Sequence, residues 1–490
     1  MIVREMSNNG LLTQIELLLP DIRTRLALTI IITTIFGVAS GTLTPRGPLT
    51  STQTIATMFG ALLVGAIGGL LMQNRWASFV IPATYWVAME LSRINITGPT
   101  VDGIQLGSLY GVIAFILGRG LHAVIVFTPM ILGIQYGAGP IASGTFVPRE
   151  NIGLIVFTVI VVLFSAALVN PATTKPIDQS NSIAEFTKVS LGGEEQTLLI
   201  RGYDKDNPVL LYLAGGPGGT DLGAMRMFLS DLEKDYLVVT WEQRGAGKSY
   251  PALDPTETLT LEQTISDTLE LTNYLRTRFN KDKIYIVANS WGTIPSVYAV
   301  KRSPELFYAY VGTGQMVNVL ETDRMFYEDS LEYARETGNT GLENELLGNG
   351  LPPYEDLMNY MTIVSTEHSW NSYPGQSSEV EMPNILMVPE YSLLEKLHAL
   401  PATLDTYSVL YPQIQDVDFR EEAASLDVPV YMVIGEYEAR GRAVLADEWF
   451  ELLDAPYKER VEFSNTGHRP LFEKPDTFVE LMKRIKNETG

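Results

Sequence analysis

The chain has 490 residues, too many for one ordinary domain, and 46% of them are hydrophobic. Its charge is uneven: residues 1–170 hold eight basic and six acidic residues, whereas the remainder holds 27 and 51, for a net charge of −22. An acidic C-terminal part argues against a nucleic-acid partner, because phosphate binding requires basic patches. The absence of cysteine excludes disulfides, thiolate catalysis and cysteine metal sites.

The N-terminal part is predicted to cross a membrane. An amphipathic run from Leu11 to Leu19 is suited to the membrane surface. Six apolar runs of spanning length follow, near residues 24–44, 54–73, 76–92, 103–118, 121–139 and 151–169. None has the polar face that helices of a soluble bundle carry. We therefore expect a multi-pass protein of the cell membrane, with the lipid bilayer as a partner.

The number of spans decides on which side the C-terminal part lies. The fourth and fifth runs are separated only at Gly118–Gly120. If they form one helix, the C-terminal part changes sides, so the side of the membrane stays open.

Glycines and charges within these runs indicate how the helices pack. Glycines recur four residues apart, a spacing that allows helices to approach closely, although chance in glycine-rich sequence is the alternative. The pairs are Gly37/Gly41, Gly65/Gly69, Gly107/Gly111 and Gly133/Gly137. Glu90 is expected to pair with Arg93 at the membrane interface rather than to carry protons. The polar, proline-containing residues 171–182 are predicted to form a linker.

From residue 183 to 490, short strands alternate with helices. The strands are predicted at 184–190, 196–201, 208–214, 236–241, 284–288, 307–312, 429–434 and 458–463. The helices are predicted at 222–233, 260–279, 292–303, 442–453 and 475–487. This alternation is typical of a mostly parallel sheet with helices on both faces, which binds ligands at the carboxyl ends of its strands. A helix-rich, acidic insertion at about 313–427 is predicted to form a cap over the site.

A serine stands where such a sheet would expose it. The β-branched and aromatic run that starts at Ile284 ends at Asn289, and Ser290 precedes Trp291, Gly292 and a predicted helix. A strand, a tight turn with serine and a helix make a nucleophile elbow, whose usual pattern is G-x-S-x-G. Ala288 replaces the first glycine and adds only a methyl group. The alternative is an ordinary strand followed by a serine helix cap.

Two glycine-containing loops follow earlier strands. In a serine hydrolase, a loop such as Gly215–Gly219 supplies an oxyanion donor beside the backbone N–H of Trp291. The second loop, residues 241–249, resembles a phosphate-binding loop but has Glu242 where that motif requires glycine. A structured turn with Arg244 paired to a carboxylate is the better interpretation.

The base and acid of a triad should follow Ser290 in the order acid, then histidine. His468 follows the last predicted strand, whereas the other histidines are His122 in the membrane part and His368 and His398 in the insertion. After the preceding strand come Glu436 and Glu438, and we favour Glu438. Its carboxylate would hold the imidazole in the required tautomer and stabilise the imidazolium.

Four motifs resemble those of α/β-hydrolases of the prolyl aminopeptidase (proline iminopeptidase) family. They are Gly-Gly-Pro-Gly-Gly at 215–219, Trp-Glu-Gln-Arg-Gly-Ala-Gly-Lys-Ser at 241–249, Asn-Ser-Trp-Gly at 289–292 and Thr-Gly-His-Arg-Pro at 466–470. The resemblance covers roughly residues 183–490. It implies the α/β-hydrolase fold with a helical cap, here preceded by an all-α transmembrane domain of about six helices. No cofactor and no metal are expected.

The resemblance also implies roles for single residues. Ser290 would be the nucleophile, His468 the base, and the backbone N–H groups of Gly216 and Trp291 the oxyanion hole. The family's acid is usually aspartate after Gly-x-Tyr, a position that leads here to Glu438. Three further departures are Ala214 for histidine, Glu242 for aspartate and Ala288 for glycine. Cap carboxylates hold the substrate amine in the family, and the candidates here are Glu321, Asp323 and Glu328.

Three functions are compatible with these observations. The first is a membrane-anchored serine hydrolase with a Ser-His-Glu triad that releases N-terminal residues from peptides. The second is an esterase or lipase for lipid or small acyl esters, suggested by the membrane part. The third is a receptor or transporter-like protein with an inert hydrolase domain. The oligomeric state stays open.

Overall fold

The computed structural model describes residues 11–376, 380 and 384–490, so parts of the predicted cap, 377–379 and 381–383, lie outside it. The chain divides into two compact units. The helical unit holds the described chain up to Pro171 together with Ser392–Pro401. The sheet unit holds Ala172–Tyr391 and Ala402–Gly490. The predicted boundaries of the membrane domain, linker and hydrolase domain remain predictions.

The helical unit begins with the short helix α2 (Leu11–Leu18). The elements that follow are α3 (Ile22–Leu43), α4 (Ser51–Met72), α5 (Ala77–Ser92), α6 (Leu109–Phe115), η1 (Ile116–Gly120), α7 (Leu121–Tyr136), η2 (Gly137–Ile141) and α8 (Ile152–Val169). Within the described residues, four helices are long and apolar enough to cross a membrane: α3, α4, the continuous segment Leu109–Ile141 and α8. The sixteen residues of α5 form a shorter apolar helix.

The predicted break at Gly118–Gly120 is wrong, because α6, η1, α7 and η2 form one continuous helix. Arg119, the charge that suggested a break, is buried. Its guanidinium lies 3.0 Å from Glu90 and donates hydrogen bonds to the carbonyls of Val101 and Asp102. A buried charge is tolerated when paired and hydrogen-bonded, so the helix continues through this position. Glu90 also pairs with Arg93 at 2.5 Å, as predicted.

Three of the four predicted glycine pairs lie at close helix contacts. A Cβ atom at Gly65 would lie 2.1 Å from the carbonyl oxygen of Met130 in α7, and one at Gly137 would lie 2.0 Å from that of Ala66 in α4. Gly37 and Gly41 meet the backbone of α5 in the same way. By contrast, nothing lies within 4 Å of a Cβ at Gly107. The glycines therefore let the α3/α5 and α4/α7 backbones touch.

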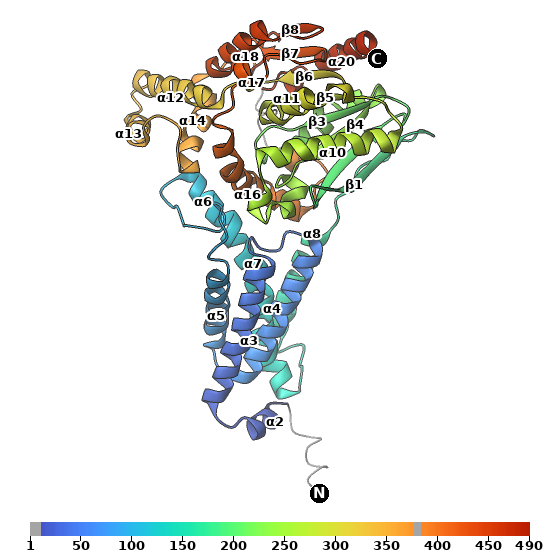
Figure 1. The fold of residues 1–490 in the computed structure, drawn as a ribbon. Helices are drawn as coiled ribbons and strands as arrows, with labels where there is room; N and C mark the ends of the chain where they lie inside the picture. Colours follow the sequence, from blue (N-terminus) through green and yellow to red (C-terminus); the bar gives the residue numbers. More distant parts are fainter. Residues whose placement is uncertain (1–10, 377–379, 381–383) are drawn as a thin grey trace. The chain divides into compact units, whose positions relative to one another are not determined.

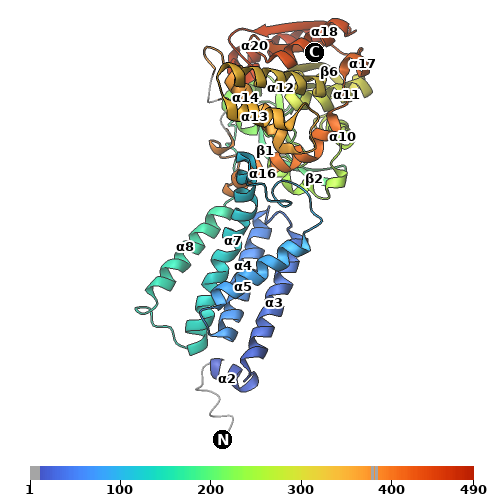
Figure 2. The same ribbon diagram turned by 90° about the vertical axis from the view of Figure 1, so that its left-hand side faces the viewer.

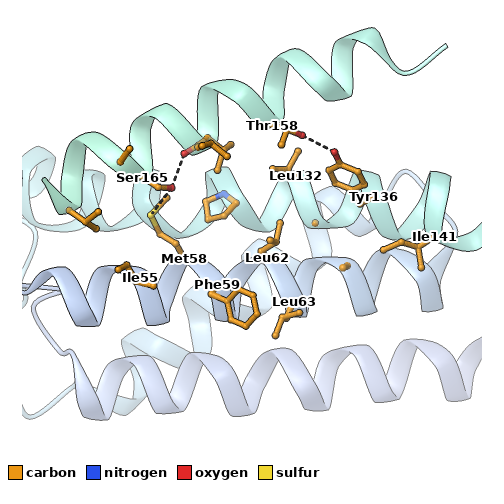
Figure 3. Close-up of a pocket in the computed structure, with 17 residues that line it drawn as sticks. Ile55, Met58, Phe59, Leu62, Leu63, Leu132, Tyr136, Ile141, Thr158 and Ser165 are labelled. Atoms are coloured by element: carbon orange, nitrogen blue, oxygen red, sulfur yellow. Dashed lines mark hydrogen bonds between the residues drawn. The ribbon is translucent and has the colours of Figure 1, made fainter. Parts of the chain in front are cut away.

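Helix α8 stands apart from α7 along part of its length (Figure 2). An apolar cavity of about 570 Å³ lies between α8, α4 and α7 (Figure 3). Its polar side chains bond one another or the backbone: the Tyr136 and Thr158 hydroxyls lie 2.9 Å apart, and Ser165 donates to Met58 Sδ and to a backbone carbonyl. The wall thus presents mostly hydrocarbon.

The sheet unit contains one sheet of eight strands in the order β1-β2-β4-β3-β5-β6-β7-β8 (Figure 1). Its strands are β1 (Ile183–Leu191), β2 (Glu194–Gly202), β3 (Val209–Leu213), β4 (Leu237–Glu242), β5 (Ile284–Asn289), β6 (Phe307–Thr313), β7 (Val430–Gly435) and β8 (Lys458–Phe463). Strand β2 pairs antiparallel with β1 and β4, and the remaining pairs are parallel. The predicted, mostly parallel sheet is confirmed.

Helices cover both faces of this sheet. On one face, α9 (Leu222–Phe228) and α20 (Pro475–Thr489) enclose a core that includes Tyr212, Tyr285 and Met482. On the other face lie α10 (Leu261–Phe279) and α11 (Thr293–Arg302) (Figure 1). Further helices are α18 (Arg440–Leu452) and α19 (Pro470–Glu473). Between β6 and β7, the described chain forms α12 (Val319–Glu336), α13 (Thr340–Asn349), α14 (Leu357–Trp370), α16 (Leu393–Leu410) and α17 (Phe419–Glu422).

Candidate active site

Ser290 sits in a tight turn between β5 and α11. Its φ is +52°, in the left-handed region that side chains rarely adopt. A Cβ atom at Gly292 would lie 2.5 Å from the carbonyl oxygen of Leu213 in β3, so the turn requires glycine there. A serine with a strained backbone in a tight turn from a strand to a helix is what defines a nucleophile elbow, the motif that the sequence predicted here.

The structure brings His468 and Glu438 to this serine from two other loops. His468 Nε2 lies 2.9 Å from Ser290 Oγ, and His468 Nδ1 lies 2.9 Å from Glu438 Oε2. Each side chain follows a different strand: β5, β7 or β8. Because these parallel strands end at the same edge, three segments distant in sequence form one hydrogen-bonded chain. The other candidate acid, Glu436, is exposed and instead accepts from the Asn465 backbone N–H at 2.8 Å.

The charge of Glu438 is set by its neighbours. Burial alone would raise the pKa of this carboxyl, but Arg442 and His468 lower it to about 2. Glu438 Oε1 accepts from Arg442 Nε at 2.8 Å and from the Ala439 backbone N–H at 2.9 Å. An ionised carboxylate at Nδ1 holds that nitrogen protonated and leaves Nε2 free to accept the Ser290 proton.

The glycine loop lies beside the serine. A Cβ atom at Gly215 would lie 3.3 Å from Ser290 Cβ. Gly216 has φ of +140°, and a Cβ there would lie 2.5 Å from the Gly219 backbone nitrogen, so this loop requires glycine. Trp291 is buried directly after the serine. Gly216 and Trp291 thus belong to the two chain segments next to Ser290, the segments predicted to supply an oxyanion hole.

Gln243 is a supporting residue that the sequence analysis did not identify. Its Nε2 donates to the carbonyl of Ala214 at 3.2 Å, and its Oε1 accepts from Trp291 Nε1 at 3.0 Å. One buried amide therefore holds both segments that flank the serine. The neighbouring Arg244 pairs with Asp267 at 3.2 Å, as predicted for this turn. The only feature of the sequence that pointed to Gln243 was its place next to Arg244, in a turn already predicted to be structured.

Asp221 is a second such residue. Its Oδ2 accepts from the Tyr212 hydroxyl at 2.8 Å and from the Gly215 backbone N–H at 3.2 Å. Its Oδ1 accepts from Arg469, the neighbour of His468, at 2.5 Å. The carboxylate thus joins the glycine loop to the histidine loop. An aspartate shortly after the glycines was its only sequence signal.

The three predicted amine-binding carboxylates differ in their partners and their burial. Glu321 pairs with Arg420 at 2.6 Å, and Glu328, which is exposed, pairs with Arg440 at 3.2 Å. Asp323 is buried and accepts from the Tyr411 hydroxyl at 2.6 Å. Burial raises the pKa of Asp323 to about 7, although its hydrogen bonds oppose this shift.

No group of three His, Asp or Glu side chains suited to a metal ion occurs within residues 11–376, 380 and 384–490.

Known proteins match the sheet unit. A sequence model of the family described as alpha/beta hydrolase fold matches residues 208–344. The probable aminopeptidase YbaC of Bacillus subtilis (strain 168) is 28% identical over 311 residues, which cover 63% of this chain and 98% of that protein. A probable proline iminopeptidase of Leptolyngbya boryana is 26% identical over 132 residues, 27% of this chain and 39% of that protein.

Solved structures are similar over the same share of the chain. The proline iminopeptidase-related protein of Thermus thermophilus is 19% identical, with a TM-score of 0.43 over 63% of this chain and 98% of that one. The proline iminopeptidase of Mycobacterium smegmatis is 14% identical, with a TM-score of 0.43 over 62% and 98%. Together with the sheet order and the strand-to-helix turn at Ser290, the family match shows that the sheet unit has the α/β-hydrolase fold.

Proposed function

We propose that the protein is a serine hydrolase with Ser290 as nucleophile, His468 as base and Glu438 as the orienting acid. The observation that carries the proposal is the hydrogen-bonded chain from Ser290 Oγ through both imidazole nitrogens to Glu438, with 2.9 Å at each step. Nucleophile, base and orienting carboxylate within hydrogen-bond reach are what covalent catalysis by serine requires.

The proposed reaction has two halves. His468 Nε2 takes the proton of Ser290 as Oγ attacks the substrate carbonyl carbon, and the N–H groups of Gly216 and Trp291 stabilise the oxyanion. The imidazolium then protonates the leaving amine, which leaves an acyl group on Ser290. Water, deprotonated by His468, attacks this ester and releases the acid, and the proton returns to Ser290.

The proposed substrates are peptides that lose their N-terminal residue, as for a prolyl aminopeptidase. The support is the probable aminopeptidase YbaC, which this chain matches over 98% of that protein's length. The four apolar helices support anchoring in the membrane as a multi-pass protein. We therefore propose a transmembrane domain over residues 1–170, a linker over 171–182 and a hydrolase domain over 183–490.

The test is hydrolysis of proline arylamide by the full chain in detergent, comparing wild type with Ser290→Ala. We expect the variant to lose about 10⁴- to 10⁶-fold in turnover and to resist labelling by a fluorophosphonate probe. Ser303→Ala, at the other end of α11, is the control and should behave as wild type. Full activity of Ser290→Ala would refute the triad.

Acyl esters and lysophospholipid serve as comparison substrates, since the apolar helices also suit an enzyme that acts on lipid esters. Ser290-dependent hydrolysis of these substrates without arylamide hydrolysis would keep the triad and refute the aminopeptidase assignment. A wild-type protein that neither reacts with the probe nor turns over any of these substrates would instead be an inert hydrolase domain.

A further inference from the structure

Arg442 joins the acid of the candidate triad to the cap. Its Nε donates to Glu438 Oε1 at 2.8 Å, and its NH2 group donates to Oε1 of Glu367 on cap helix α14. All three residues are buried, each at most 9% exposed. The guanidinium also lies over the ring of Phe326 in α12, 4.7 Å from the ring centroid. One arginine is thus held between a carboxylate at the sheet and another from the insertion.

We propose that Glu367 is a positioning residue that strengthens His468 as a base through Arg442 and Glu438. The proposal rests on the proposed function, because it assigns a role in the same reaction. Glu367 does not touch the imidazole; it acts by determining the net charge behind it.

The charges support this role. Glu438, Arg442 and Glu367 together carry a net charge of −1. When His468 takes the serine proton, the imidazolium brings the buried group to zero. Without Glu367, Arg442 and Glu438 would neutralise each other, and the imidazolium, whose side chain is only 22% exposed, would lack a compensating charge, which is costly. Glu367 therefore favours the protonated ring, and so the transfer of the proton to it.

Other charged groups near this chain of residues keep their partners when Glu367 is neutralised. Asp323 of α12 interacts with Arg442 electrostatically and bonds Tyr411. Glu473 of α19 accepts from the Gly467 backbone N–H at 3.0 Å and from the Tyr373 hydroxyl at 2.5 Å. Arg469 pairs with Asp221. A change confined to Glu367 thus reports on the Arg442 and Glu438 charges.

The position of Glu367 gives the cap a part in the chemistry. Glu438 follows β7 of the sheet, whereas Glu367 belongs to an insertion helix. A cap helix that moves away removes the compensating charge. The base would therefore be strongest with α14 in place.

The experiment is the pH dependence of kcat and kcat/KM for Glu367→Gln, using the full chain and proline arylamide. We expect the acidic limb of both profiles to move to lower pH by roughly 0.5 to 1 unit and the plateau of kcat to fall about 3- to 10-fold, because the imidazolium loses its compensating charge. Glu367→Asp, which keeps the charge, should retain the wild-type limb. Glu343→Gln is the matched control, because it breaks a Glu–Arg pair on the cap surface at 2.9 Å from Arg335.

Each outcome has a distinct meaning. An acidic limb of Glu367→Gln that coincides with wild type, in a folded and active protein, overturns the inference and leaves the proposed function standing. A limb that moves equally in Glu343→Gln also overturns it, since the shift would then be a general effect of lost surface charge. Absence of Ser290-dependent turnover in the wild type refutes the proposed function instead. If Glu367→Gln does not fold, the charged variant Glu367→Asp is compared with the neutral variant Glu367→Ser. Acidic limbs at the same pH in these two variants would overturn the inference.

Discussion

The imidazole of His468 lies directly against Gly314, the residue after strand β6. A Cβ atom on Gly314 would lie 2.6 Å from Cε1 and 2.8 Å from Nδ1 of the ring. Gly314 also has φ of +55°, which disfavours any side chain. The ring reaches Ser290 and Glu438 at a position that has no room for a methyl group, so this glycine belongs to the support of the site.

Gly314→Ala is therefore expected to displace the ring and to lower turnover about 100-fold, the scale of a misplacement of roughly 1 Å. The measurement is the kcat for proline arylamide. Gly338→Ala is the control: its φ is +66°, so the backbone strain is similar, but nothing lies within 4 Å of the added Cβ. Equal loss of activity in both variants would show that strain alone, and not contact with His468, is responsible.

Asp221→Asn should uncouple the glycine loop from the histidine loop. An amide cannot accept from Tyr212, Gly215 and Arg469 as the carboxylate does, so at least one buried donor loses its partner. We expect kcat/KM to fall about 10- to 100-fold and the protein to lose about 1–3 kcal/mol of stability. Asp231→Asn, an exposed carboxylate paired with Lys234, is the control. Unchanged kcat/KM in Asp221→Asn would remove this residue from the support of the site.

Asp323 should make stability depend on pH. Its pKa is about 7 in the folded protein and near 3.8 when unfolded, so between these values the native state binds more protons and stability falls as pH rises. Asp323→Asn removes this titration. We therefore expect the variant to become more stable relative to wild type as pH rises from about 4 to 7. Thermal unfolding of the full chain across this range tests it, and parallel curves for the two proteins would contradict it.

Gly137→Ala should loosen the contact between α4 and η2, the segment that continues α7. The added Cβ would lie 2.0 Å from the carbonyl oxygen of Ala66, so the helices must move apart, which costs about 1–3 kcal/mol. Gly139→Ala lies in the same π-helical segment, but nothing is within 4 Å of its Cβ, so it serves as the control. The measurement is the unfolding temperature in detergent. If the two variants unfold at the same temperature, the helices accommodate the added methyl group at Gly137 without loss of stability, and the prediction is wrong.

Much of the sheet unit could be predicted because its signals are local. Buried strands have β-branched runs, and Ser290, Glu438 and His468 each follow one of them. Their places at the carboxyl ends of parallel strands, together with the family resemblance, suggested that they would meet. The cap could not be predicted in the same way. Glu321, Asp323 and Glu328 lie on one helix, and a sequence does not tell which carboxylates find an arginine on the surface and which are buried beside tyrosine.

Contacts that support the site from distant segments of the chain could not be predicted from the sequence either. The hydrogen bonds of Gln243, Asp221 and Arg442 each join segments that meet only after folding. In the helical unit, Arg119 was interpreted as a break because a charge in an apolar run usually lies at a helix end. Its partner Glu90 is 29 residues away along the chain, and nothing local indicates that the two will meet.

The continuous helix from Leu109 to Ile141 changes the count of passes through the helical unit. Glycine contacts align α3 with α5 and α4 with α7 in the same direction, and Tyr136 facing Thr158 reverses α8 against α7. In a bilayer that α5 crosses together with the four longer helices, the chain passes five times between Ile22 and Val169, and these two residues emerge into different compartments. A reporter fused at the N-terminus and a protease site placed after Val169 would then never be accessible from the same side of an intact vesicle.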